Sequence, residues 1–192
     1  MRRRDRGGMF GRGHVLHGVE GEYTDIKPAN VLVSSSGQVK LADFGIISQM
    51  RPRSEMLDLV DGTIMNRTVV GTTRYMSPER LRGETYTRSS DVWSVGLLLL
   101  EVVRGDSPFE DISSVFELVQ TLDECPMSEF VPDSTSVGLR EILMGCLDHS
   151  PNKRIPAATL LSSPWFQFHD INDVVDASSL MMVYLESADT PA

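Results

Sequence analysis

Three polar residues between positions 25 and 43 have the types and the spacing that metal-assisted chemistry needs. Asp25 is followed by Asn30, and Asp43 opens an Asp-Phe-Gly triplet. Carboxylate and amide oxygens are the ligands that the hard cation Mg²⁺ prefers. Asp25 and Lys27 lie just upstream, where a carboxylate can meet a hydroxyl group and an ammonium can meet a phosphate. The sequence therefore predicts a magnesium site at Asn30 and Asp43.

A β-hairpin is the element that must position these residues. Two short apolar runs, 31–33 and 39–41, are joined by a Ser-Ser-Ser-Gly turn at 34–37. Short apolar runs around such a turn are typical of a hairpin. Because a hairpin brings its two ends together, we expect Asn30 and Asp43 to lie side by side.

The order and spacing of Asp25, Lys27-Pro28, Asn30 and Asp43-Phe44-Gly45 resemble the catalytic loop and metal-binding triplet of protein kinases. The resemblance implies ATP and Mg²⁺ as cofactors. It also implies that Asp25 orients a substrate hydroxyl and accepts its proton, while Lys27 steadies the phosphoryl group. Asn30 and Asp43 match the two metal-holding positions.

Further motifs continue the resemblance after Asp43. An activation segment is expected over 43–79, closing with Ser77-Pro78-Glu79. The runs Val-Gly-Thr at 70–72 and Tyr-Met-Ser-Pro-Glu-Arg-Leu at 75–81 are similar to those of the MAP kinase kinase group. That likeness implies a MAP kinase as substrate, an upstream kinase as activator, and Thr72 as a residue shaping the substrate groove.

Two threonines occupy places where that group is phosphorylated. Thr68 matches an activating phosphosite, and an ordinary exposed loop threonine is the alternative reading. Thr63 is a second candidate, although it lies one residue further from Thr68 than paired sites usually do. Phosphate at either position would add charge and acceptor oxygens that can order a loop.

A long apolar helix is predicted after Ser90-Asp91, which read as an N-capping pair, and it should stop at Gly105. It is hydrophobic nearly all round, so it should be the buried centre of the domain. The resemblance implies that Asp91 caps the backbone of the catalytic loop. It also implies a buried ion pair between Glu79 and Arg154.

Two amphipathic helices are predicted at 113–122 and 137–147, and a last short helix should begin at Pro156. Cys146 on the second amphipathic helix reads as a buried structural thiol. We expect a disordered or non-homologous segment at 1–22, one domain that resembles a kinase C-terminal lobe at 23–166, and a tail at 167–192. The tail could dock on its own domain or receive an upstream kinase.

Bulk properties narrow the class of protein. The 192 residues suffice for one substantial core, and the net charge of −9 argues against a general nucleic-acid binder. Two cysteines make no disulfide framework, which favours a reducing, cytoplasmic location. No apolar run reaches the roughly 18 residues that a membrane span needs.

The expected fold is mainly α with a small β-hairpin, the C-terminal lobe of a protein kinase. A kinase N-terminal lobe takes roughly 60 residues or more, whereas 24 residues precede Asp25 in this sequence. We therefore expect that lobe to be absent and the chain alone to be inactive. Tyr23-Thr24 replaces the usual His-Arg, and we expect the resemblance to begin at Asp25. The expected function of the intact protein is transfer of the ATP γ-phosphoryl group to Ser or Thr of a MAP kinase, with Tyr as a further acceptor if the assignment to the MAP kinase kinase group holds. The alternative is a non-catalytic, pseudokinase-like binding or scaffold module.

Overall fold

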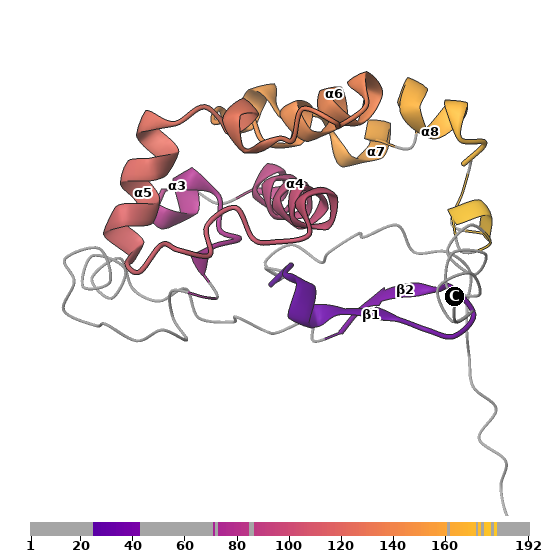
Figure 1. Cartoon of the computed structure of the whole chain (residues 1–192), viewed down its shortest axis with the longest axis horizontal. Coiled ribbons are helices and arrows are strands. Elements are labelled where there is room, and N and C mark those ends of the chain that lie inside the picture. Colours follow the sequence, from indigo (N-terminus) through magenta and orange to yellow (C-terminus); the bar gives the residue numbers. More distant parts are fainter. Residues whose placement is uncertain are drawn as a thin grey trace, which may run out of the picture.

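The computed structural model describes residues 25–42, 71, 73–84, 87–160, 162–171, 173, 175–177 and 179. Within these ranges the protein is mainly helical with one two-stranded antiparallel sheet, which confirms the expected mainly α fold with a small hairpin (Figure 1). The expected lobe assignment stays a prediction. Several predictions made from the sequence lie outside the described residues. They concern the segment 1–22, Tyr23-Thr24, Asp43, Thr63, Thr68, Thr72, most of the activation segment and the end of the tail.

The predicted hairpin is confirmed. It consists of β1 (Val31–Val33) and β2 (Val39–Leu41), paired so that Val31 faces Leu41 and Val33 faces Val39. Gly37 in the turn has a φ of 71°, a left-handed conformation that glycine adopts without steric cost. The 3-10 turn η1 (Pro28–Asn30) leads directly into β1, so Asn30 lies immediately before the hairpin.

Helix α4 (Arg88–Arg104) is the central element. It ends as predicted at Gly105, whose φ of 84° supplies the left-handed residue that closes many helices. The predicted start was wrong, because the N-cap is Thr87 and not Ser90. Ser90 lies one turn inside, where its Oγ accepts a hydrogen bond from the Thr87 N–H at 3.3 Å and completes a capping box.

The core is built where α4 packs on α6 (Val137–Cys146). Trp93 and Leu100 of α4 and Leu143 and Cys146 of α6 are fully buried. At Gly96 an added Cβ would lie only 2.7 Å from the Cys146 Cβ. The absence of a side chain at Gly96 is therefore what allows the two helices to approach so closely.

The remaining helices surround this pair. Both predicted amphipathic helices are confirmed, one as α5 (Val115–Glu124) and the other as α6. Pro156 does precede a short helix, α7 (Ala157–Leu160), but this helix is not the last, because α8 (Pro164–Phe168) follows it. The shorter elements are α3 (Pro78–Leu81), η2 (Met127–Phe130) and η3 (Pro151–Lys153).

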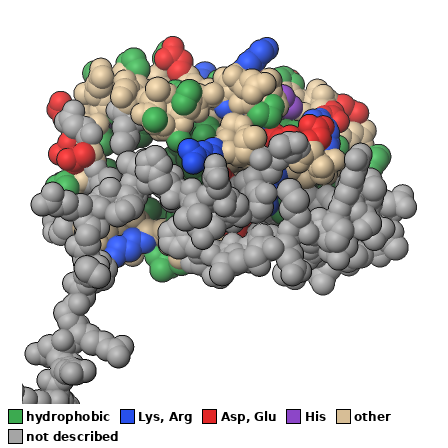
Figure 2. Space-filling view, turned by 180° about the vertical axis from the view of Figure 1, so that it is seen from behind, with side chains coloured by type: hydrophobic (Ala, Val, Ile, Leu, Met, Phe, Trp, Pro, Cys, Tyr) green, Lys and Arg blue, Asp and Glu red, His purple; other side chains and the backbone are tan. Residues whose placement is uncertain are grey.

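In Figure 1 helices α6, α7 and α8 lie on one side of α4 and the hairpin lies on the other. Figure 2 shows acidic and basic side chains interspersed over the helical part of the opposite face. None of the helices in the described part of the chain combines the length and the apolar character that a bilayer crossing requires.

Candidate active site

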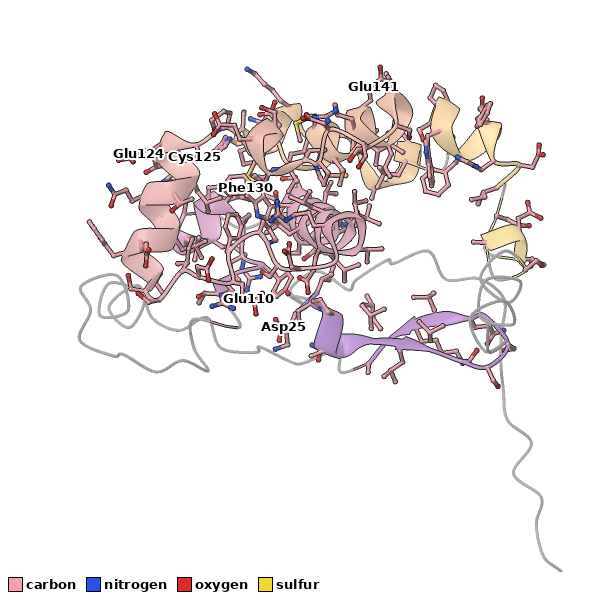
Figure 3. The ribbon with its side chains drawn as sticks, viewed as in Figure 1. Asp25, Glu110, Glu124, Cys125, Phe130 and Glu141 are labelled. Carbon is pink, nitrogen blue, oxygen red and sulfur yellow. The ribbon has the colours of Figure 1, made fainter. Side chains whose placement is uncertain are left out.

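Asp25, Lys27 and Asn30 lie together immediately before the hairpin. Figure 3 shows Asp25 at this end of the hairpin. The Lys27 Nζ is 2.6 Å from the Asp25 Oδ2, and about a fifth of each side chain is exposed. Asn30 donates from its Nδ2 to the Asp25 backbone carbonyl at 2.8 Å and more weakly to Oδ2 at 3.4 Å. The structure thus brings the predicted base and its predicted cationic neighbour into direct contact.

The turn η1 produces this arrangement. The backbone of Lys27 is extended, and Pro28 is the first residue of the turn. Proline is suited to this position because the N–H that it lacks would have no partner within the turn. The Asn30 N–H then donates to the Lys27 carbonyl at 2.9 Å, which closes the turn. Lys27 and Asn30 are therefore held by a backbone bond, and Asp25 by the side chains of these two residues, all within six positions of the chain.

The hairpin returns the chain to Asn30. The N–H of Ala42, the last described residue of this segment, donates to the Asn30 carbonyl at 2.7 Å. Asp43 is the next residue in the sequence and lies outside the described residues. The shared metal site of Asn30 and Asp43 therefore stays a prediction.

The donor set at Asn30 fits a hard cation. The bonds from Nδ2 to Asp25 determine which end of the amide faces Asp25, and they leave the Asn30 Oδ1 as a cation ligand. Among the described residues no group of three or more His, Cys, Asp or Glu side chains could hold a metal.

The predicted ion pair of Glu79 and Arg154 is present and buried. The Arg154 Nη1 and Nη2 each lie 2.7 Å from a carboxylate oxygen of Glu79, and the two side chains are 0% and 4% exposed. Burial alone would raise the pKa of Glu79. The hydrogen bonds from Arg154 and Ser90 outweigh burial and lower that pKa to about 2. Glu79 is thus a carboxylate over the whole physiological range.

Arg154 connects three parts of the chain. Its Nε donates to the Asp148 carbonyl at 2.8 Å, its Nη1 to the Ser89 carbonyl at 3.0 Å, and its Nη2 to the His149 carbonyl at 3.3 Å. With the two bonds to Glu79, these use all five N–H donors of the guanidinium group. Its Cζ also lies 5.1 Å from the centre of the Trp93 ring. This fully bonded guanidinium holds α3, the start of α4 and the 148–154 turn together.

Two serines that sequence reasoning missed hold Tyr75 and Glu79, which lie at the end of the predicted activation segment. Ser90 donates to the Glu79 Oε1 at 2.6 Å, and Ser94 donates to the Tyr75 carbonyl at 2.7 Å. Both serines lie on one face of the otherwise apolar helix α4, because residues four apart share a face. Two hydroxyl residues at that spacing in such a helix were the signal that could have identified them.

The side chains of Arg74 and Tyr75 bind residues that are 26 to 38 positions away in the sequence. The Tyr75 hydroxyl donates to the Glu101 Oε2 at 2.5 Å, and burial together with this neighbouring carboxylate raises the pKa of Tyr75. Arg74 donates from Nη2 to the backbone carbonyls of Glu110 and Ile112 at 2.8 and 3.1 Å. The segment that follows Thr72 is therefore bound both to α4 and to the loop before α5.

Asp91 lies in the first turn of α4 and is half-buried. Its predicted role, capping the backbone of the catalytic loop, stays a prediction.

A family model described as "Protein kinase domain" matches residues 14–166. The match begins upstream of Asp25, so our expectation that the resemblance starts at that residue was wrong. It ends at Phe166, where the last expected motif also ends.

Most of the curated relatives that we compared are MAP kinase kinases. Mitogen-activated protein kinase kinase 2 of Arabidopsis thaliana is 33% identical over 171 residues, covering 86% of this chain and 43% of the relative. Mitogen-activated protein kinase kinase 3 of the same plant is 35% identical, covering 88% and 31%. The dual specificity mitogen-activated protein kinase kinase dSOR1 of Drosophila melanogaster is 32% identical, covering 79% and 42%. The chain spans less than half the length of these relatives.

The family model covers most of the chain, and within that span the structure holds a two-stranded hairpin beside a mainly helical core. The chain belongs to the protein kinase domain family, and its relatives are mostly MAP kinase kinases.

Proposed function

We propose that this chain carries the C-terminal lobe of a protein kinase of the MAP kinase kinase type. The reaction is transfer of the γ-phosphoryl group of ATP to a Ser or Thr hydroxyl, and to Tyr, of a MAP kinase. The names of the relatives support this substrate class. The contact of Asp25 with Lys27 and Asn30 is the observation that carries the proposed chemistry.

Each residue has a separate role in the proposal. The Asp25 carboxylate accepts a hydrogen bond from the substrate hydroxyl, orients its oxygen and takes its proton. Lys27, 2.6 Å from that carboxylate, places positive charge where charge develops on the phosphoryl oxygens. Asn30 and Asp43 hold Mg²⁺, which when bound neutralises charge on the ATP phosphates.

The arrangement also explains why the turn at Pro28 matters. Catalysis of phosphoryl transfer depends mostly on positioning and on charge neutralisation, so the reacting groups must be held in one geometry. The hydrogen bond from Asn30 to the Asp25 carbonyl couples the proposed metal ligand to the proposed base. Displacement of either residue should therefore disturb both.

The regulation that we propose rests on the resemblance to the MAP kinase kinase group. Phosphate on Thr68, or on Thr63, would come from an upstream kinase and would order the activation segment. Thr72 shapes the groove for the substrate. Arg74 and Tyr75, which follow it, have the bonds that hold this part of the chain in place.

The test is phosphoryl transfer by the protein as its own cells make it. An affinity tag at the C-terminus of the protein as it is encoded recovers it together with any residues encoded on either side of this sequence. The purified protein is incubated with labelled ATP, Mg²⁺ and an unphosphorylated MAP kinase. We expect label in the MAP kinase, and Asp25→Asn should reduce the rate by a factor of about 10² to 10⁴.

The control is Asp133→Asn, because Asp133 is an exposed carboxylate in the loop before α6. This variant should transfer phosphate at the wild-type rate. Binding of the MAP kinase without any transfer, by wild type and Asp25→Asn alike, would contradict the enzymatic function and support the binding-module alternative. The 192-residue chain, assayed in parallel, tests the expectation that it is inactive by itself.

A further inference from the structure

Arg74 joins two segments that are far apart in the sequence. Its Nη2 donates to the backbone carbonyls of Glu110 and Ile112 at 2.8 and 3.1 Å. Both carbonyls thus meet one positively charged group, and hydrogen bonds from an ionised donor are stronger than those from a neutral donor. Arg74 therefore holds the loop before α5 against the segment that contains Arg74 itself.

This loop is anchored at both ends and exposed between them. Phe109 and Ile112 are 1% and 8% exposed, whereas Glu110 and Asp111 between them are exposed. The Glu110 carbonyl belongs to the exposed part, so burial of the two apolar side chains does not determine its direction. The bond from Arg74 does. Without that cation the two carbonyls would repel each other, and the loop would turn them toward water.

Helix α5 begins directly after the loop. Its N-cap Ser114 accepts a hydrogen bond from the Glu117 N–H at 3.1 Å. The Glu117 carboxylate accepts bonds from the N–H and the hydroxyl of Ser113, both at 3.0 Å. These bonds tie both serines to the first turn of α5, as a capping box does. The start of α5 should therefore move together with the loop.

The segment around Arg74 is fixed to α4 independently of the loop. Ser94 is 2% exposed and donates to the Tyr75 carbonyl, and the Tyr75 hydroxyl donates to Glu101. Arg74 thus reaches the loop from a base that α4 holds in place. Thr72, the proposed groove residue, lies two positions before Arg74 in the sequence.

We propose that Arg74 is a positioning residue for the protein substrate. It holds residues 110–112 and the start of α5 beside the substrate groove, where they form part of the surface that binds the substrate. This inference rests on the proposed function, since it takes a MAP kinase as the substrate and Thr72 as a groove residue. Arg74 acts through the loop and not on the reacting groups, so its loss should weaken substrate binding and leave the chemical step unchanged.

The first test is steady-state kinetics of the protein as it is encoded, recovered by its C-terminal tag. Arg74→Ala should raise the KM for an unphosphorylated MAP kinase about tenfold and leave kcat and the KM for ATP unchanged. Arg74→Lys should restore most of the loss, because both bonds come from one nitrogen and the lysine ammonium also has several N–H donors. A purely structural role would lower the amount of active protein and leave both KM values unchanged. An unchanged KM for the MAP kinase would overturn the proposal.

The matched control is Arg82→Ala, which removes another arginine that contacts α5. Arg82 pairs with Asp123 near the far end of that helix, and both side chains are partly exposed. This variant should have wild-type KM values. A rise in the KM for the MAP kinase equal to that of Arg74→Ala would overturn the proposal, because the effect would then not depend on the loop.

The second test measures binding of the MAP kinase in the Asp25→Asn background, with and without Arg74→Ala. We expect Arg74→Ala to raise the Kd about tenfold. Weaker binding, together with no phosphoryl transfer by the wild type, would contradict the proposed enzymatic function and support the positioning role. Transfer by the wild type with an unchanged Kd and KM would do the reverse. Neither transfer nor binding by the wild type would overturn both.

The third test follows the route through the loop. Hydrogen exchange of the Ser113 and Glu117 amides should become faster in Arg74→Ala and stay at the wild-type rate in Arg82→Ala, because only the first variant releases the start of α5. Equal exchange in the two variants would overturn the proposal.

Discussion

At the scale of single residues, Arg154 is the most heavily bonded side chain of the described part of the molecule. Its five N–H groups meet two carboxylate oxygens of Glu79 and three backbone carbonyls. Such a buried pair costs desolvation to form, and its main effect is to determine geometry. Removal of one partner leaves the other as an unpaired buried charge.

We therefore expect Glu79→Ala to lower the free energy of unfolding by about 3–5 kcal/mol. Urea denaturation followed by circular dichroism measures this loss. The control is Asp123→Ala, which breaks the exposed pair of Asp123 with Arg82 and should cost less than about 1 kcal/mol. Equal losses in the two variants would show that burial of the Glu79 pair has no energetic consequence.

Acid should weaken the fold through the same carboxylate. The pKa of Glu79 falls from 4.5 to about 2 on folding, so the unfolded chain binds a proton over a range where the folded chain does not. The stability from this group is complete above about pH 5 and is lost as the pH falls toward 2. Between pH 5 and 3, wild type should therefore lose more unfolding free energy than Glu79→Gln. Parallel losses in the two proteins, measured by urea titration at each pH, would contradict the low pKa.

At the scale of elements, the contact of α4 with α6 depends on one missing side chain. Gly96 faces the Cys146 Cβ and the Leu147 side chain at 2.7–2.9 Å from where its own Cβ would be. Gly145 in α6 is different, because an added Cβ would lie 3.4 Å from the nearest atom of Ile155. The two glycines therefore form a matched pair.

We expect Gly96→Ala to destabilise the protein by about 1–3 kcal/mol, because the helices must move apart. Gly145→Ala should be neutral or should stabilise by up to about 1 kcal/mol, since alanine is the better helix former. Thermal unfolding of the two variants under one set of conditions gives the comparison. A greater loss for Gly145→Ala would mean that the α4–α6 spacing is not the constraint.

At the scale of the whole molecule, the core and the surface differ in chemical reactivity. Cys146 is fully buried, and burial raises the pKa of its thiol to about 11. Cys125 follows the last turn of α5 and is half-buried. Because the thiolate is the reactive form, reaction at Cys146 requires that the core opens.

We therefore predict that an alkylating reagent modifies Cys125 in the native protein and spares Cys146. Cys146 should react only as fast as the whole domain unfolds, so urea should accelerate its labelling in step with the loss of helical signal. Mass spectrometry of the labelled peptides gives both rates. Labelling of Cys146 that is faster than unfolding would reveal a local opening of α6.

The candidate site was predictable wherever its parts are close in the sequence. The hairpin follows from two apolar runs around a Ser/Gly turn, and the contact of Asp25 with Lys27 and Asn30 is made within six residues. The start of α4 was placed three residues too late, because both Thr87 and Ser90 are suitable capping residues. Only the backbone conformation of Thr87 identifies it as the N-cap.

By itself the sequence determined the family, the hairpin, the apolar character of α4 and the identity of the Glu79–Arg154 pair. Only the tertiary structure decided that Ser90 and Ser94 bind Glu79 and Tyr75, and that Arg74 reaches the carbonyls before α5. The physical reason is how far apart in the sequence the residues lie that determine each feature. Turns and helices form from neighbouring residues, whereas these bonds depend on how α4 is rotated and packed against segments remote in the chain. Neither hydrophobic periodicity nor local propensity predicts how α4 is rotated.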